Sequence, residues 1–120
     1  MQRRDNFQVE IGGLMGLLKD RKYAQVGSNL IEVNLSPLLF NPDILVLFRE
    51  GFFELELLVN NSCIKKEKIP LGTYKLKGVG TDYSSQNSLI IIVTVNVNPL
   101  KWTSFEYKLE VNGQEHDLIE

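Results

Sequence analysis

The sequence predicts a mainly β protein: a single antiparallel β-sandwich, jelly-roll or immunoglobulin-like, of about eight strands with one short N-terminal α-helix. Two observations lead to this fold class. Apolar and polar residues alternate along most of the chain, and turn residues separate the alternating stretches at short intervals. With 120 residues, 43% of them hydrophobic and 23% charged, the chain is long enough for one core. No repeat, charge run or low-complexity stretch divides it, so we expect one domain over residues 1–120.

The N-terminal part predicts a strand followed by the helix. Apolar residues alternate with polar ones over Phe7–Ile11, and a glycine pair then breaks the pattern. Leu14, Met15 and Leu18 continue from Ile11 at helical spacing, which predicts a short amphipathic helix from about Gly13 to Lys22. Its basic end suits a helix C-terminus.

The rest of the chain is expected to be nearly all strand. Period-two alternation predicts strands over 31–35, 53–59 and 103–111, and a continuous apolar run predicts another over 44–48. The most apolar stretch, 89–98, is expected at the centre of a sheet. Asn112-Gly113 is a strong hairpin signal, followed by a weak return strand over 114–119.

A lysine-rich hairpin is predicted in the middle of the chain. Its strands would be Cys63–Ile69 and Thr73–Val79, and Pro70-Leu71-Gly72 would close it as a tight turn. A polar loop over 80–87 is expected to follow.

The residues that could carry catalysis are few. Cys63 is the single cysteine, which excludes an intramolecular disulfide and a cysteine-ligated zinc site, and its strand-like surroundings predict a packed thiol. The single histidine, His116, lies in a polar tail. Glu54 and Glu56 would project from one strand face, as paired carboxylates of glycosidases do, but a solvated strand face is the favoured interpretation. We therefore predict no catalytic residue, no metal site and no cofactor, and a protein that is not an enzyme.

Large apolar side chains at the expected loops and strand ends form the leading functional signal. Exposed apolar clusters mark partner surfaces, and aromatic residues are favoured anchors. The alternative is that these residues close the ends of the sandwich and belong to its core. The predicted partner-binding residues are Leu38, Leu39, Phe40, Phe52, Phe53 and Trp102. They predict a non-enzymatic protein–protein interaction module whose partner is another protein or itself: an adaptor, an inhibitor, or an assembly or structural component, viral proteins included.

A lysine cluster supports an alternative function. Lysines on one hairpin surface could bind nucleic acid or anionic lipid headgroups. Three features oppose this: a net charge of −2, the absence of arginine in the cluster, and the common use of lysine to protect exposed sheet edges. The candidate anion-binding residues are Lys65, Lys66, Lys68, Lys75 and Lys77.

Cellular location and family can be predicted only in broad terms. The longest apolar run, Leu89–Val93, is too short for a transmembrane segment, and the N-terminus lacks the apolar region of a secretory signal, so we expect an intracellular, cytoplasmic protein. The closing segment Phe105–Gly113 is similar to hairpins of many immunoglobulin-like, C2-like and viral tail or capsid sandwiches. This resemblance covers a small part of the chain and implies a sandwich fold without a function.

Overall fold

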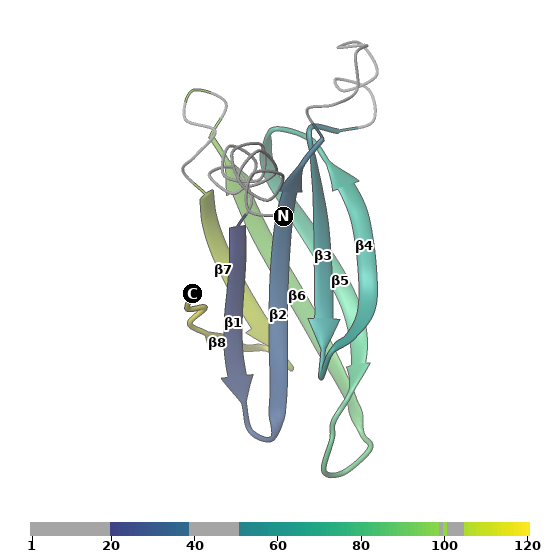
Figure 1. Ribbon diagram of the computed structural model, residues 1–120. Helices are drawn as coiled ribbons and strands as arrows, with labels where there is room; N and C mark the ends of the chain where they lie inside the picture. Colours follow the sequence, from purple (N-terminus) through teal and green to yellow (C-terminus); the bar gives the residue numbers. More distant parts are fainter. Residues whose placement is uncertain (1–19, 39–50, 99, 101–104) are drawn as a thin grey trace, which may run out of the picture.

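The computed structural model describes residues 20–38, 51–98, 100 and 105–120, which form eight antiparallel strands (Figure 1). Four strands make the first sheet: β1 (Asp20–Val26), β2 (Asn29–Pro37), β3 (Phe53–Val59) and β4 (Ser62–Ile69). The other four make the second sheet: β5 (Gly72–Thr81), β6 (Ser88–Val97), β7 (Phe105–Val111) and β8 (Gln114–His116).

Neighbouring strands in each sheet are also neighbours in the sequence. The first sheet has the order β1-β2-β3-β4 and the second has the order β5-β6-β7-β8. This order differs from that of jelly-roll and immunoglobulin domains, in which strands distant in sequence pair within one sheet. Two-residue turns at 27–28, 60–61 and 112–113 join β1 to β2, β3 to β4 and β7 to β8, and short connections favour pairing between successive strands.

One hydrophobic core includes side chains from both sheets. Along β2, β3 and β6, buried residues alternate with half-buried or exposed ones. The rings of Phe53 in β3 and Phe105 in β7 meet edge to face, with centroids 5.6 Å apart. Gly78 in β5 packs closely enough that a Cβ atom there would lie 3.1 Å from a methyl group of Leu57. The largest fully buried side chains are those of Phe53, Ile31, Leu35, Leu55, Leu57, Ile69, Leu76, Ile91, Leu109, Val33, Val93 and Val95.

The edge beside β1 is held by the end of the chain. Tyr23 and Ile119 exchange two backbone hydrogen bonds, of 2.6 and 2.8 Å. Nearby, the Tyr107 hydroxyl donates to Asp20 Oδ2 at 2.8 Å. Burial and this hydrogen bond raise the pKa of Tyr107 far above its ordinary value. The first and last described segments are therefore joined across the two sheets.

Several predicted elements are confirmed, and the end of the predicted helix is wrong. The alternating stretches near 31–35, 53–59 and 105–111 are strands, and β6 lies inside its sheet between β5 and β7. The predicted helix covers residues of which 13–19 lie outside the described part, but Asp20–Lys22 belong to β1 and pair with β2. Pairing along a whole strand outweighs the weak helical preference of a short segment. The predicted strands over 7–11 and 44–48 also lie outside the described residues.

The predicted lysine-rich hairpin is wrong, because its two strands belong to different sheets. β4 pairs with β3, and β5 pairs with β6. Asn60 and Asn61 have φ angles of 51° and 67°, the left-handed backbone of a two-residue hairpin turn, so they direct β4 back onto β3. Pro70 then follows β4, where its missing N–H suits a departure from the sheet.

Candidate functional site

The structure places two of the predicted partner-binding residues in the core. Phe52 is 3% exposed and Phe53 is 0% exposed, so neither side chain is accessible to a binding partner. Leu38 is half-buried and packs against the core. For these residues the alternative, a role in closing the core, agrees with the structure. Leu39, Phe40 and Trp102 lie outside the described residues, and their role stays a prediction.

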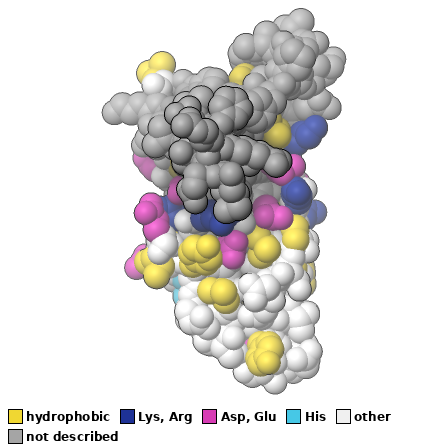
Figure 2. Space-filling model, viewed as in Figure 1, with side chains coloured by type: hydrophobic (Ala, Val, Ile, Leu, Met, Phe, Trp, Pro, Cys, Tyr) yellow, Lys and Arg dark blue, Asp and Glu magenta, His cyan; other side chains and the backbone are white. Residues whose placement is uncertain are grey.

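The predicted lysine surface is divided between two outer faces. Lys66 and Lys68 lie opposite Glu56 and Glu54 on the outer face of the first sheet, and Lys66 Nζ is 3.5 Å from Glu54 Oε1. The charged side chains on this face are of both signs (Figure 2). A single basic surface from four lysines would require the hairpin that the structure does not form.

The other lysines extend along β5. Lys75 and Lys77 are exposed, whereas the residue between them, Leu76, is buried in the core. Their side chains therefore project from the outer face of the second sheet. Lys65 lies on β4 and is paired with Glu67, at 3.6 Å between Nζ and Oε1. All the candidate lysines thus lie on β4 and β5, the edge strands of the two sheets, where lysine opposes edge-to-edge aggregation.

A hydrogen bond links these two edge strands. The Tyr74 hydroxyl on β5 donates to Glu67 Oε2 on β4. This hydrogen bond raises the pKa of Tyr74, because the carboxylate stabilises the protonated phenol.

Glu54 and Glu56 have the surroundings of a solvated strand face. Both are half-buried, Glu54 is paired with Lys66, and Glu56 Oε1 accepts a hydrogen bond of 3.2 Å from Asn34 Nδ2. Within the part of the chain that the structure describes, no group of three or more histidine, cysteine or acidic side chains is arranged to hold a metal ion.

Cys63 is exposed, so the prediction of a packed thiol is wrong. A register shift at Leu57/Leu58 places Cys63 opposite Leu58, whose side chain is half-buried on the outer face. Ile64, the next residue, packs against the core instead. The strand was predicted correctly, but the bulge that decides which face each side chain takes was not visible in the sequence.

An apolar patch lies on the outer face of β5 and β6, and none of its residues was predicted to form a site. Val79 is 58% exposed and Ile90 is 44% exposed, and the two are directly opposite each other. Ile92 follows on the same face of β6 and lies opposite Lys77. We call Val79, Ile90 and Ile92 the β5–β6 patch. The available signal was that residues 90 and 92 are isoleucines on the otherwise polar side of the strand.

The charges around the β5–β6 patch are balanced on one side only. On β7 and β8, Lys108 Nζ lies 3.5 Å from Glu110 Oε1 and 3.7 Å from Glu115 Oε1. On β5, neither Lys75 nor Lys77 forms an ion pair with any described residue. Within the described part of the chain, the patch is therefore apolar with a basic flank that has no acidic partner.

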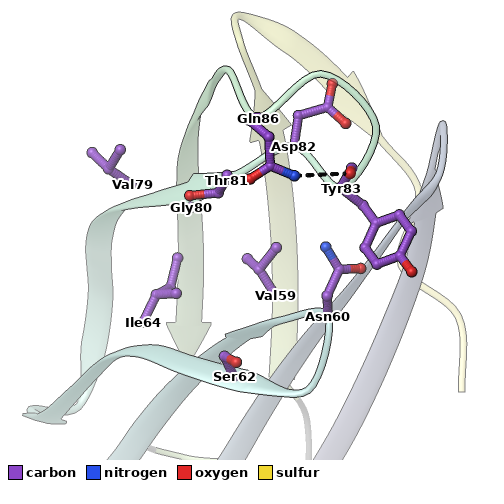
Figure 3. Close-up of a pocket in the computed structure, with 10 residues that line it drawn as sticks. All are labelled: Val59, Asn60, Ser62, Ile64, Val79, Gly80, Thr81, Asp82, Tyr83 and Gln86. Atoms are coloured by element: carbon purple, nitrogen blue, oxygen red, sulfur yellow. Dashed lines mark hydrogen bonds between the residues drawn. The ribbon is translucent and has the colours of Figure 1, made fainter.

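A hollow of about 290 Å³ lies between one end of β5 and the turn that joins β3 to β4 (Figure 3). Val59, Ile64 and Gly80 supply apolar lining, and polar groups of the 81–86 loop complete it. Gln86 Nε2 donates to the Tyr83 carbonyl at 3.1 Å within this loop. The hollow and the β5–β6 patch share Val79.

Buried Asn29 fixes the loop that borders the hollow. Its Oδ1 accepts hydrogen bonds from the Tyr83 N–H at 2.8 Å and from Asn60 Nδ2 at 3.0 Å. Its Nδ2 donates to the Val26 carbonyl at 3.2 Å and to Asp82 Oδ1 at 3.3 Å. The β1–β2 turn, the β3–β4 turn and the long loop after β5 are therefore joined at one residue.

Comparison with known proteins gives no relative. No family model matches the chain, and no curated protein or solved structure matches it. Among the described residues, no helix has the length and apolar character to cross a membrane. The candidate site is therefore the β5–β6 patch with its lysines, defined by geometry alone.

Proposed function

We propose that the two sheets form a β-sandwich and that the chain is a non-enzymatic protein–protein interaction module that binds through the β5–β6 patch. The observation that carries this proposal is the exposed cross-strand pair Val79 and Ile90. Burying exposed apolar surface contributes roughly 25 cal/mol per Å², so two aliphatic side chains supply a useful share of a binding energy. Adaptor, inhibitor and assembly roles all fit such a surface.

The charge beside the patch indicates the kind of protein that binds. Lys75 and Lys77 have no ionic partner among the described residues, so a partner with carboxylates next to apolar side chains would match both features. Complementary charges at an interface mainly increase association rate and specificity. The proposed partner is therefore another protein with an apolar, acidic surface.

The test is a double substitution on the patch. Val79→Thr with Ile90→Thr keeps β-branched residues in the strands while removing apolar surface. A protein captured by the wild-type chain is purified, and its affinity is measured by calorimetry. We expect the double variant to bind at least tenfold more weakly.

The matched control is Leu58→Thr, which changes a half-buried apolar side chain on the outer face of the other sheet. It should leave the affinity unchanged. Equal affinity of wild type and double variant would contradict the proposed function.

Anion binding is the second candidate, and it is favoured because Lys75 and Lys77 form no ion pair with any residue that the structure describes. Retention on heparin that falls steeply with salt, and that is lost in Lys75→Gln with Lys77→Gln, would support it. The control pair is Lys66→Gln with Lys68→Gln on the first sheet, where carboxylates lie opposite both lysines. No retention at low salt would exclude a nucleic-acid or lipid-headgroup role. The cytoplasmic location stays a prediction.

A further inference from the structure

We infer that the free edge of β5 receives an extended, acidic segment of another protein as an added strand. This inference rests on the proposed function and specifies how the partner binds. Among the described strands, β5 pairs with β6 alone and forms one edge of its sheet. It is ten residues long, which gives a partner several backbone groups to bond. Peptides that add to a sheet edge gain affinity from main-chain hydrogen bonds and specificity from alternate side chains.

The backbone groups of β6 show which residues of β5 face this edge. The Ile90 carbonyl accepts a hydrogen bond of 2.8 Å from the Asn112 N–H, and the Ile90 N–H donates to Asn112 Oδ1 at 2.9 Å. The polar backbone groups of Ile90 therefore point away from β5. In an antiparallel pair, the residue opposite must then also point its backbone groups outward. That residue is Val79.

The same alternation extends along the whole of β5. Its register with β6 runs without a shift from Gly72 to Thr81. Just beyond Thr81, the Asp82 N–H donates to the Asn87 carbonyl at 2.8 Å. Asp82 and Asn87 are thus a hydrogen-bonded pair, as expected three residues after the non-hydrogen-bonded pair of Val79 and Ile90. The residues whose N–H and C=O groups face the open edge are therefore Thr73, Lys75, Lys77, Val79 and Thr81. Their side chains are all exposed on the outer face.

This arrangement specifies the sequence of the added strand. Side chains opposite Lys75 and Lys77 would be acidic, because opposite charges on neighbouring strands stabilise a sheet. The side chain opposite Val79 would be apolar and would extend the β5–β6 patch. A second copy of β5 fits less well, since none of its outward-facing residues is acidic and it could not pair with Lys75 and Lys77 in any register. The best partner therefore has two acidic residues and one apolar residue at alternate positions.

The hollow beside Val79 fits the other face of such a strand. It lies between Ile64 of edge strand β4 and Gly80 of edge strand β5 (Figure 3). Side chains of the added strand that point toward the first sheet would approach this hollow, and its apolar lining suits an aliphatic or aromatic residue.

The test uses two synthetic peptides, Thr-Val-Thr-Glu-Thr-Glu-Thr for antiparallel addition and its reverse for parallel addition. Amide exchange of the ¹⁵N-labelled protein is followed by NMR with and without peptide. We expect the amides of residues 75, 77 and 79 to exchange at least tenfold more slowly when the matching peptide is bound. Peptides with Lys in place of Glu should give no protection.

A proline variant separates the edge from its charge. Lys75→Pro removes an N–H that faces away from β6, at an edge position where proline is tolerated, and Lys75→Gln removes the charge alone. We expect Lys75→Pro to bind the glutamate peptide at least tenfold more weakly than Lys75→Gln. If Lys75→Pro does not fold, the exchange pattern of the wild-type protein decides the question.

The outcomes separate this inference from the proposed function. Protection at alternate β5 residues together with the proline effect supports strand addition. Shifts confined to Val79, Ile90 and Ile92 without protection of the edge amides overturn it and leave patch binding intact. If neither peptide binds, strand addition is overturned as well. The proposed function is then judged separately, by whether the Val79→Thr with Ile90→Thr variant impairs binding of the captured protein. If the protein binds heparin and both glutamate peptides with equal affinity, and Lys75→Pro changes none of these affinities, strand addition is overturned in favour of anion binding.

Discussion

Asn29 is a buried polar residue whose side chain joins three turns by hydrogen bonds. Replacing it with alanine would leave the Tyr83 N–H and the Asn60 amide without their acceptor. A buried group that loses its partner costs about 1–3 kcal/mol. We expect Asn29→Ala to lower the free energy of unfolding by about 2–3 kcal/mol in urea titration. Ser28→Ala, which removes only an exposed hydrogen bond of 2.7 Å between the Ser28 and Ser84 hydroxyls in the same region, should lower it by about 1 kcal/mol or less.

Two glycines allow a matched comparison of backbone strain. Gly51 has a φ angle of 131°, and an added Cβ would lie 2.7 Å from the Ile69 carbonyl oxygen. Gly27 has a φ angle of 61°, and its Cβ position is open. Gly51→Ala should therefore destabilise by about 3 kcal/mol or more, from strain and overlap together, and Gly27→Ala by about 1 kcal/mol, from strain alone. Equal losses in urea titration would contradict the close approach at Gly51.

Asp82 makes stability depend on pH in the acid range. Hydrogen bonds from the Ser84 N–H, the Asn29 side chain and Ser85 lower the pKa of its carboxyl below the ordinary value. The stabilisation from this group is therefore complete above the unfolded-state pKa of about 3.9 and is lost as pH falls through the lower folded-state pKa. We expect Asp82→Asn to lose less stability than wild type on acidification below about pH 4. Identical acid slopes in urea titrations would show that Asp82 is not bonded in this way.

At the scale of elements, the C-terminal residues close the edge beside β1. Two backbone hydrogen bonds join Ile119 to Tyr23, and Glu120 pairs with Lys22 at 2.9 Å. Deleting residues 119 and 120 should lower stability by about 1–3 kcal/mol, since each backbone bond contributes about 0.5–1.5 kcal/mol and the exposed ion pair contributes little. The Tyr23 amide should also lose protection from exchange. Unchanged protection of Tyr23 would contradict the observed bridge.

The elements also show what the sequence could predict. Strands such as β3 and β7 were predictable because each buries one face, and burial of one face imposes alternation. The partner of β4 was not, because the choice between β3 and β5 depends on the Asn60-Asn61 turn competing with Pro70-Leu71-Gly72. Local signals of similar strength do not show which of them closes a hairpin.

At the candidate site, the sequence could not distinguish exposed residues from buried ones. Side chains such as Phe52 and Phe53 are large and apolar whether they face a partner or the core, so burial had to come from the structure. The lysines were predicted on exposed strands, and all five are exposed there. Their distribution over two faces depends on the pairing of β4 and β5, which the sequence did not determine.

At the scale of the whole molecule, the two long edges differ. The C-terminal segment pairs with β1 on one side, whereas on the other side β4 and β5 share the Tyr74–Glu67 hydrogen bond and no backbone hydrogen bond among those described. Val79 of the β5–β6 patch lies on this second side, together with Lys75 and Lys77, which form no ion pair with a described residue. The proposed function and the strand-addition inference both depend on this asymmetry.

The most direct test is amide exchange along β5 in the free protein, followed residue by residue by NMR at a concentration where light scattering gives the mass of a monomer. We expect an alternating pattern: slow exchange at Tyr74, Leu76, Gly78 and Gly80, and fast exchange at Thr73, Lys75, Lys77 and Val79. Uniformly slow exchange from residue 73 to residue 80 would mean that the edge is already paired. That result would contradict both the free edge and the binding mode built on it.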